Sequence, residues 1–445
     1  MLKSRRSFIA EVVSGAYGLP YAAARAAETC PSPIESAATS GSSISRVKSV
    51  LRRDGTITRY PCNGDIFPMT WVRGDRQVSS FSDGLGWPRK HLEVYNTRAI
   101  EMVGDPADLT FEEIPGYPDL PNVDPAHRPL YYGFGLLSVD ATIYQYLCSY
   151  GKPAPSSGLR WDSVKLIYSP DRGRTWLNQD GTTPVSLETY DQQSRKTMLF
   201  LSEPQQAFSL VSLLQMGRDY QLNSDGYVYG CGPNGNTDGT MNQLVMFRVP
   251  KARVLERSAY EFFGGFRSRD EPIWSSDIHA RDIVHHFPRG WVNSTSDQMN
   301  VVQSWLPSVV YNAPLGLYLM AGSGVGCRDN GDWAKPSYLG LWTAPEPWGP
   351  WTQIYEDTAW TPGNDGLARC YSPQIAPKWI AADGRSFWLV WSDFQQRCDE
   401  AEERRFAEEV RRLRDHNQSM RMLFEQGRHC SPYYAFNAQR FDLVV

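Results

Sequence analysis

The chain has 445 residues, of which 41% are hydrophobic, and its formal net charge at pH 7 is −4. This acidic balance argues against a nucleic-acid-binding protein, because such proteins are usually basic. After the first 26 residues, no run approaches the ~20 apolar residues that a permanent membrane span needs. The length exceeds the usual prior for one domain, although large β folds run long as single units.

The first 26 residues have the pattern of a twin-arginine export signal. Arg5 and Arg6 precede a modestly apolar stretch, and Ala24-Arg25-Ala26 is a small-x-small cleavage site. A cytoplasmic amphipathic helix is the alternative, but glycines and a proline interrupt it. Cleavage after Ala26 would change the net charge from −4 to −7. We therefore expect a soluble periplasmic or extracellular protein with no membrane partner once the signal is removed.

Residues 27–44 are rich in Ala, Ser and Gly and indicate a flexible linker before a domain spanning residues 45–445. The eight cysteines are compatible with one to three disulfides in an oxidising compartment and show no C-x-x-C spacing. The seven histidines show no metal-ligand spacing, and no phosphate-binding loop is present. We therefore expect no metal and no cofactor, and a monomer.

Five segments have the pattern of a β-hairpin, in which two β-rich runs flank a turn containing Asp or Gly. They pair residues 70–73 with 78–81, 135–139 with 142–144, 220–222 with 227–229, 308–311 with 318–320, and 376–380 with 386–391. Radial repetition of small sheets is one solution to the exposure of sheet edges. The pattern predicts an all-β fold, a five-bladed β-propeller.

A helical insertion is predicted at residues 399–426, where Glu, Arg and Ala dominate and apolar residues recur at helical spacing. Strand character resumes at residues 433–445, so the insertion is expected inside the last blade. Cys398 and Cys430 flank the insertion, and we expect a disulfide at its base.

The segment from Ser169 to Trp176 matches the Asp-box pattern S-x-D-x-G-x-T-W. In propellers this box is a hairpin turn, in which the Asp accepts backbone hydrogen bonds and the Gly takes a positive φ. We expect a structural role for Asp171.

Several longer strings carry a resemblance to a known family. They are Asp65 to Trp71, Ser82 to Gly86, Phe247 to Lys251 with Arg257 to Phe263, Ala344 to Thr352, and Ser372 to Gln374 with Pro377 to Trp379. Together they resemble a bacterial family long labelled a domain of unknown function, similar to five-bladed propeller glycosidases and associated with endo-D-arabinanases. The resemblance covers about residues 45–394 and 432–443.

The resemblance implies hydrolysis of a glycosidic bond by two carboxylates, one acting as acid and one as base. Asp65 stands before the first inner strand, and Asp83 ends its returning partner and is followed by glycines, so these two are our candidates. A turn residue is the alternative for each. The family pattern has a Gly before its second acid, whereas this chain has Ser82. Asp219 could supply a third carboxylate, although strand-entry capping would also explain it.

Sugar recognition favours flat aromatic rings, planar amides and cations. Candidates at strand ends or loops are Trp71, Trp87, Asn96, Trp305, Asn312 and Lys378. Core packing is the alternative for each Trp.

The sequence thus predicts a secreted glycoside hydrolase acting on arabinan-like or related polysaccharides, with inversion. Two alternatives stay open. One is a non-catalytic carbohydrate-binding propeller, and the other is a polysaccharide lyase, which would need a Tyr or His base.

Overall fold

The structure is a computed structural model that describes residues 46–89, 92–121, 128–152, 161–194, 200–235, 241–268, 271–287, 293–294, 300–301, 306–327 and 333–445. The predicted export signal and the whole of the predicted linker lie outside these residues.

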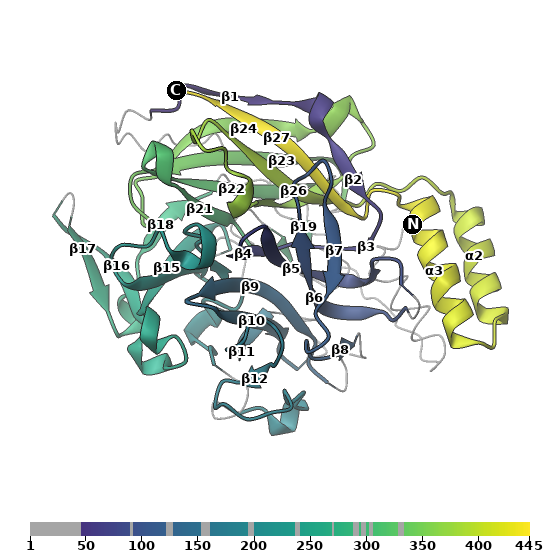
Figure 1. The fold of residues 1–445 in the computed structure, drawn as a ribbon, viewed down its shortest axis with the longest axis horizontal. Coiled ribbons are helices and arrows are strands. Elements are labelled where there is room, and N and C mark those ends of the chain that lie inside the picture. The colour runs from purple at the N-terminus through teal and green to yellow at the C-terminus, as the bar shows by residue number, and fades with distance from the viewer. Residues whose placement is uncertain are drawn as a thin grey trace.

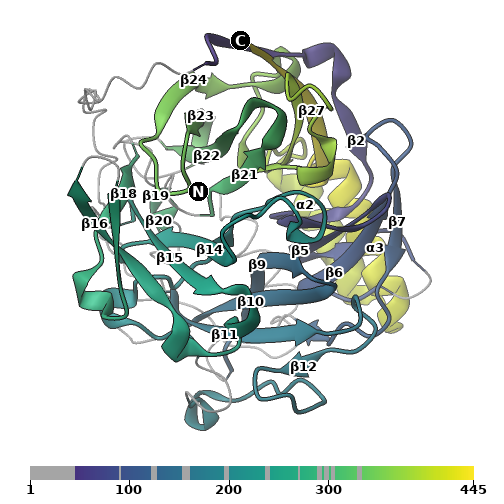
Figure 2. The same cartoon turned by 60° about the vertical axis from the view of Figure 1, so that its left-hand side comes forward.

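Five antiparallel sheets surround a central axis, so the predicted five-bladed propeller is confirmed (Figure 2). The first blade contains β3 (Asn63–Asp65), β4 (Met69–Arg73), β5 (Arg76–Gly86), β6 (Tyr95–Val103), β7 (Thr110–Glu113) and β8 (Leu120–Pro121). The second contains β9 (Tyr131–Val139), β10 (Thr142–Tyr150), β11 (Trp161–Ser169) and β12 (Leu177–Asn178). The third contains β13 (Ser212–Leu213), β14 (Tyr227–Pro233), β15 (Gln243–Pro250), β16 (Glu261–Ser268), β17 (Glu271–Ser275) and β18 (Ile283–His286). The fourth contains β21 (Ser308–Asn312), β22 (Leu317–Cys327), β23 (Trp333–Ala344) and β24 (Thr352–Trp360), and β19 (Asn293–Ser294) pairs separately with β20 (Asn300–Val301).

The fifth blade closes the ring with both ends of the described chain. It contains β25 (Cys370–Ile375), β26 (Ser386–Asp393) and β27 (Phe436–Val444), and β27 pairs with β1 (Ser49–Arg52) and β2 (Thr58–Tyr60) from the start of the domain. Figure 1 shows β1 beside β27 near the C-terminus. Pairing the first strands with the last one removes an open seam in the ring, because no blade edge is left between them.

Polar side chains join the innermost strands around the axis. Thr70 of the first blade accepts a hydrogen bond from the backbone of Ser138 in the second blade, at 2.9 Å. Gln215 donates its side-chain amide to the carbonyl of Leu136 at 2.9 Å, and its backbone pairs with the fourth blade. Ser308 accepts from the backbone of Ile375 at 2.9 Å. These contacts provide hydrogen-bond partners for backbone N–H and C=O groups that have none within their own sheet.

The propeller has two faces that matter for the site. We call the start face the one at which the innermost strands begin, as β3 does at Asn63. The turn face is the opposite one, where Gly74-Asp75 and Asp140-Ala141 connect the innermost strands to their partners.

Two of the five predicted hairpins are displaced. The inner strand of the third blade is β13, whereas the segment predicted at 220–222 lies at the end of a 3-10 helix over Arg218–Tyr220. Asp219 and Tyr220 have positive φ angles, which a β-strand does not accommodate. In the fifth blade the inner strand is β25, and Pro377 begins a 3-10 helix where a strand was predicted.

The predicted insertion lies between β26 and β27, as expected, but it forms two helices. They are α2 (Glu400–Arg412) and α3 (His416–Cys430), which lie side by side at one edge of the propeller (Figure 1). Leu413 has extended backbone angles and Asp415 caps α3, so the segment is a helical hairpin. Met420 and Phe424 of α3 are buried in one cluster with Leu85 and Leu92 of the first blade.

The expected disulfide between Cys398 and Cys430 is present at the base of this hairpin. Within the part of the chain that the structure describes, four other cysteines are buried as free thiols, namely Cys62, Cys148, Cys231 and Cys370. Among the described residues, no helix is long and apolar enough to cross a membrane.

Candidate functional site

Asp65 and Asp83 lie on neighbouring strands at the start face of the first blade. Asp65 ends β3 and is paired with Ser82 of β5, so Asp83 is the next residue along the partner strand. Asp65 is 0% exposed and Asp83 is 8% exposed. A pair of buried carboxylates is costly unless hydrogen bonds or charges compensate.

Tyr371 of the fifth blade supplies one such hydrogen bond. Its hydroxyl group donates to Oδ2 of Asp65, and its ring packs against Phe394 at a centroid distance of 4.9 Å. Phe394 in turn packs against Tyr434 at 4.9 Å, and the hydroxyl of Tyr434 donates to the backbone oxygen of Asp83 at 2.9 Å. The fifth blade therefore holds both acidic residues of the first blade.

The backbone beside these residues is in an unusual conformation. Ile66, Asp83 and Ser372 each have a φ of 49°, in the left-handed region that costs energy for residues other than glycine. Ile66 follows Asp65, and Ser372 follows Tyr371. Strained backbone at several adjacent positions is frequent at active sites, where the surrounding structure holds it in place.

The structure explains why position 84 is a glycine, which the sequence did not show. A Cβ atom at this position would lie 2.0 Å from the backbone oxygen of Asn63 and 2.7 Å from Cα of Gly64. The glycine therefore allows β5 to approach β3, which brings Asp83 to the strand that carries Asp65.

The cysteines nearest the site are not nucleophiles. Burial raises the pKa of Cys62 far above its usual value, and the charge of Asp65 raises it further. Burial and the nearby Asp393 likewise raise the pKa of Cys370. Both thiols stay protonated at neutral pH, and only the thiolate is nucleophilic.

A small cavity lies on the propeller axis, further from the start face than Asp65. Its volume of about 20 Å³ suits a water molecule but not a sugar. Residues from all five blades line it, including Met69, Phe134, Leu213, Ser308 and Gln374.

Two of the predicted binding residues lie at the start face but are engaged in packing. Asn96 of β6 is fully buried and donates its amide to the carbonyl of Tyr131 in the second blade, at 2.5 Å. Trp87 packs against Phe111 at 4.4 Å and Phe81 at 5.6 Å. Both residues stabilise the blade that carries the two acids.

Three other predicted binding residues lie toward the turn face. Trp71 pairs with Gln77 of β5, five residues from Ser82, which pairs with Asp65, so the two positions are roughly 16 Å apart along the sheet at ~3.3 Å per residue. The indole of Trp71 donates to Gly74 at 2.8 Å. Asn312 caps a turn and donates to Gly384 at 2.8 Å. Lys378 forms ion pairs with Asp75 and with Asp105, the latter at 3.0 Å. Trp305 lies outside the described residues.

Asp219 is also at the turn face and does not join the other two carboxylates. It accepts hydrogen bonds from the hydroxyl of Ser138 at 2.6 Å and from the backbone of Ala141 at 2.9 Å. Asp140 and Ala141 both have positive φ angles, so this carboxylate stabilises a strained turn. The alternative reading of a structural cap fits these contacts.

Asp171 of the predicted Asp-box lies in the turn between β11 and β12. Its carboxylate accepts from the hydroxyl of Ser169 at 2.9 Å and from the backbone of Thr175 at 2.8 Å. Trp176 is buried and donates its indole to Gly173 at 3.1 Å.

Sequence reasoning missed Tyr371, Phe394 and Tyr434. Tyr371 directly precedes Ser372-Pro373-Gln374, one of the strings that carry the family resemblance, and this position was the available signal. Nothing local marks Phe394 or Tyr434, because their importance depends on contacts between the first and fifth blades.

The fold and the site define a five-bladed β-propeller with two buried carboxylates at the start face of its first blade.

No protein-family profile and no curated protein matches the chain. A solved structure from Bacteroides ovatus is 11% identical, with a TM-score of 0.46, and covers 88% of this chain and 90% of its own. The α-L-arabinofuranosidase of Podospora anserina is 10% identical, with a TM-score of 0.41, covering 90% and 95%. The endo-arabinase of Bacteroides thetaiotaomicron is 12% identical, with a TM-score of 0.37, covering 75% and 92%. At these identities the likeness is to the fold alone.

Proposed function

We propose that the protein is an exported glycoside hydrolase that cleaves arabinan-like or related polysaccharides with Asp65 and Asp83, inverting the anomeric configuration. The observation that carries the proposal is that Asp65 and Asp83 lie on neighbouring strands at one face, beside strained backbone, with the hydroxyl group of Tyr371 donating to Asp65. The substrate class rests on the strings that resemble the arabinanase-associated family.

The hydrogen bond from Tyr371 suggests how the two roles are divided. A donor to a carboxylate favours its ionised form, so Asp65 is the base that activates water. Asp83 is then the acid that protonates the leaving oxygen. The two roles require the side chains to flank the bond that is cleaved, which neighbouring strands allow.

The test is hydrolysis of a panel of plant and bacterial polysaccharides by the secreted protein. Asp65→Asn and Asp83→Asn should each lower the rate of reducing-end release by about 10²–10⁴-fold, the usual contribution of an acid or base. Asp383→Asn is the matched control, because Asp383 only caps a turn through the backbone of Arg385. The anomer first released, followed by NMR, reports inversion. Equal turnover by all three variants would rule the pair out.

A non-catalytic carbohydrate-binding propeller is the second candidate, and the full burial of Asp65 favours it. Binding on a glycan array without product release, unchanged in Asp65→Asn, would support this reading. Unsaturated products that absorb in the near ultraviolet would instead indicate a lyase.

A further inference from the structure

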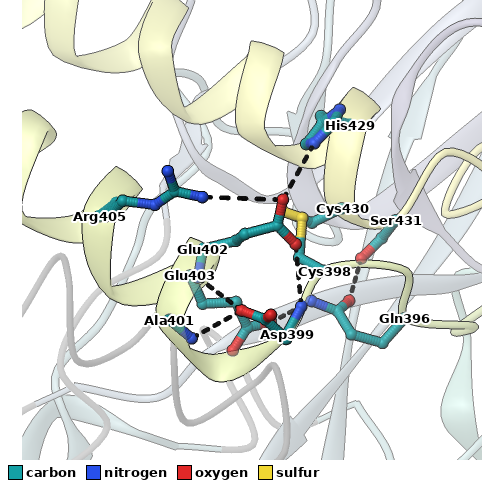
Figure 3. The surroundings of a disulfide bond; sticks show 10 residues. All are labelled: Gln396, Cys398, Asp399, Ala401, Glu402, Glu403, Arg405, His429, Cys430 and Ser431. Carbon is teal, nitrogen blue, oxygen red and sulfur yellow. Dashed lines mark hydrogen bonds and ion pairs between the residues drawn. A yellow bond between two sulfur atoms is a disulfide. The ribbon is translucent and has the colours of Figure 1, made fainter.

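The base of the helical hairpin gathers four side chains that can bind a metal ion. Ligand atoms of Cys398, Glu402 and His429 all lie within 4.8 Å of one another, and Cys430 is bonded to Cys398. Figure 3 shows Glu402 and His429 facing each other beside the disulfide.

Helix capping fixes these side chains in place. Asp399 is the N-cap of α2, and Glu402 occupies the third helical position. One carboxylate oxygen of Glu402 accepts a hydrogen bond from the backbone N–H of Asp399 at 3.1 Å. The other oxygen of Glu402 is 4.0 Å from Nε2 of His429 and 3.8 Å from the guanidinium of Arg405. Because His429 and Cys430 occupy the last turn of α3, both helices present ligands at the same end of the hairpin.

We propose that reduction of the disulfide converts this cluster into a Zn²⁺ site formed by Cys398, Cys430, His429 and Glu402. Two thiolates, one imidazole and one carboxylate are common zinc ligands, and four ligands complete the tetrahedral sphere of a structural site. The site is independent of the proposed glycosidase activity. In this state Glu402 contacts the ion, and Arg405, which is exposed, turns toward solvent.

The chemistry balances with a dithiol as the reductant. The dithiol gives two electrons and two protons to the sulfur–sulfur bond, which becomes two thiols, and is itself oxidised to a disulfide. Zn²⁺ then displaces one proton from each thiol, as metal binding to cysteine does. Thiol–disulfide exchange with a second disulfide runs the reaction backward: that disulfide accepts the two electrons and becomes two thiols, the bond between Cys398 and Cys430 forms again, and the ion is released.

Replacement of the disulfide by a Zn²⁺ ion on reduction would keep the two ends of the helical hairpin joined in both reducing and oxidising environments. Disulfides rarely persist in the cytoplasm, where thiols are kept reduced. The paired arginines predict export of the chain in its folded state. Before export, such a chain would need a cross-link other than the disulfide to join the ends of the hairpin. The hairpin is also part of the folded domain, because Met420 and Phe424 of α3 pack on Leu85 of the first blade.

The experiment compares the reduced and oxidised forms of the full chain in Co²⁺ titrations. A water-soluble phosphine reduces the disulfide, is itself oxidised with oxygen taken from water, and is removed before metal is added. The reduced protein should bind one Co²⁺ with the thiolate charge-transfer and ligand-field bands of a tetrahedral site, and Zn²⁺ should bleach them. The oxidised protein should show neither band. Reduced protein without these bands would overturn the proposal.

Variants identify the ligands without relying on activity. The double variant Cys398→Ser and Cys430→Ser keeps every other cysteine and should abolish the bands; unchanged bands would place the metal elsewhere and overturn the proposal. His429→Ala and Glu402→Gln alter side chains that are 62% and 34% exposed, so both variants should fold. Each should weaken Zn²⁺ binding at least about tenfold. His416→Ala, at the other end of α3, is the control and should bind like the parent. Equal affinity in all of these single variants would also contradict the assignment.

Discussion

The hydroxyl group of Tyr371 donates a hydrogen bond to Oδ2 of Asp65, a residue 306 positions away in the sequence. This contact joins the fifth blade to the first at the start face. Through Phe394 and Tyr434, the same blade also reaches the backbone of Asp83. The geometry of the carboxylate pair therefore depends on closure of the ring.

Tyr371→Phe should slow hydrolysis about tenfold and shift the acidic limb of the kcat/KM pH profile to higher pH. The hydroxyl stabilises ionised Asp65, so its loss raises the pKa of that carboxyl group, while the ring still packs on Phe394. Tyr434→Phe is the matched control, because it loses a bond to a backbone oxygen and should leave the limb in place. If the acidic limb of the pH profile moves equally in both variants, the hydroxyl group of Tyr371 has no specific effect on the ionisation of Asp65.

Gly84→Ala should abolish activity and lower the thermal stability strongly. The added methyl group meets backbone atoms of Asn63 and Gly64, which cannot turn away as a side chain can. Gly366→Ala is the control, because nothing lies within 4 Å of a Cβ at Gly366. Melting temperatures followed by circular dichroism compare the two, and a Gly84→Ala protein as stable as the control would show that β3 and β5 can separate without cost.

Asp219→Asn should destabilise the fold by about 1–2 kcal/mol and leave the turnover of the folded protein unchanged. The substitution weakens charge-assisted hydrogen bonds to Ser138 and Ala141 in the second-blade turn. Urea unfolding measures the first effect, and initial rates at low temperature measure the second. If turnover falls as far as in Asp65→Asn, Asp219 acts in catalysis after all.

His285 should make the protein less stable as the pH falls. Burial, together with the charge of the neighbouring His286, lowers the pKa of His285 to about 3, whereas an unfolded histidine titrates near its usual value of 6.5. Below pH 6.5 the unfolded chain therefore binds a proton that the folded chain does not, and the stability present above that pH is lost as the pH falls toward 3.

The variant His285→Phe removes this titration and keeps a ring against Phe287 and Trp342. Between pH 6.5 and 4, the parent should lose up to about 1.4 kcal/mol per pH unit more than the variant. Urea unfolding at several pH values gives both slopes. Parallel slopes would mean that His285 is protonated in the folded protein.

The blade count was predictable because hairpin signals are local. Turn residues such as Gly74, which has a positive φ of 44°, stand between β-rich runs, and the backbone preference of a glycine does not depend on distant contacts. The disulfide was predictable for a similar reason, since a helical segment with a cysteine at each end brings those ends together when it folds back. In the third and fifth blades, segments with a β-rich composition form 3-10 helices, and the inner strand lies elsewhere in the sequence.

The sequence by itself determined that this chain forms five small sheets, with acidic residues at the ends of its first inner strand and its partner. Only the tertiary structure decided which acids lie at the same face. Asp65 and Asp83 are neighbours because β3 and β5 approach each other at Gly84, and Tyr371 of the last blade donates a hydrogen bond to Asp65. Asp219 has an equally suggestive sequence setting, yet it binds a turn at the opposite face. The physical reason is that a carboxylate's role is set by the donors around it, and in a closed ring those donors come from blades that are distant in sequence.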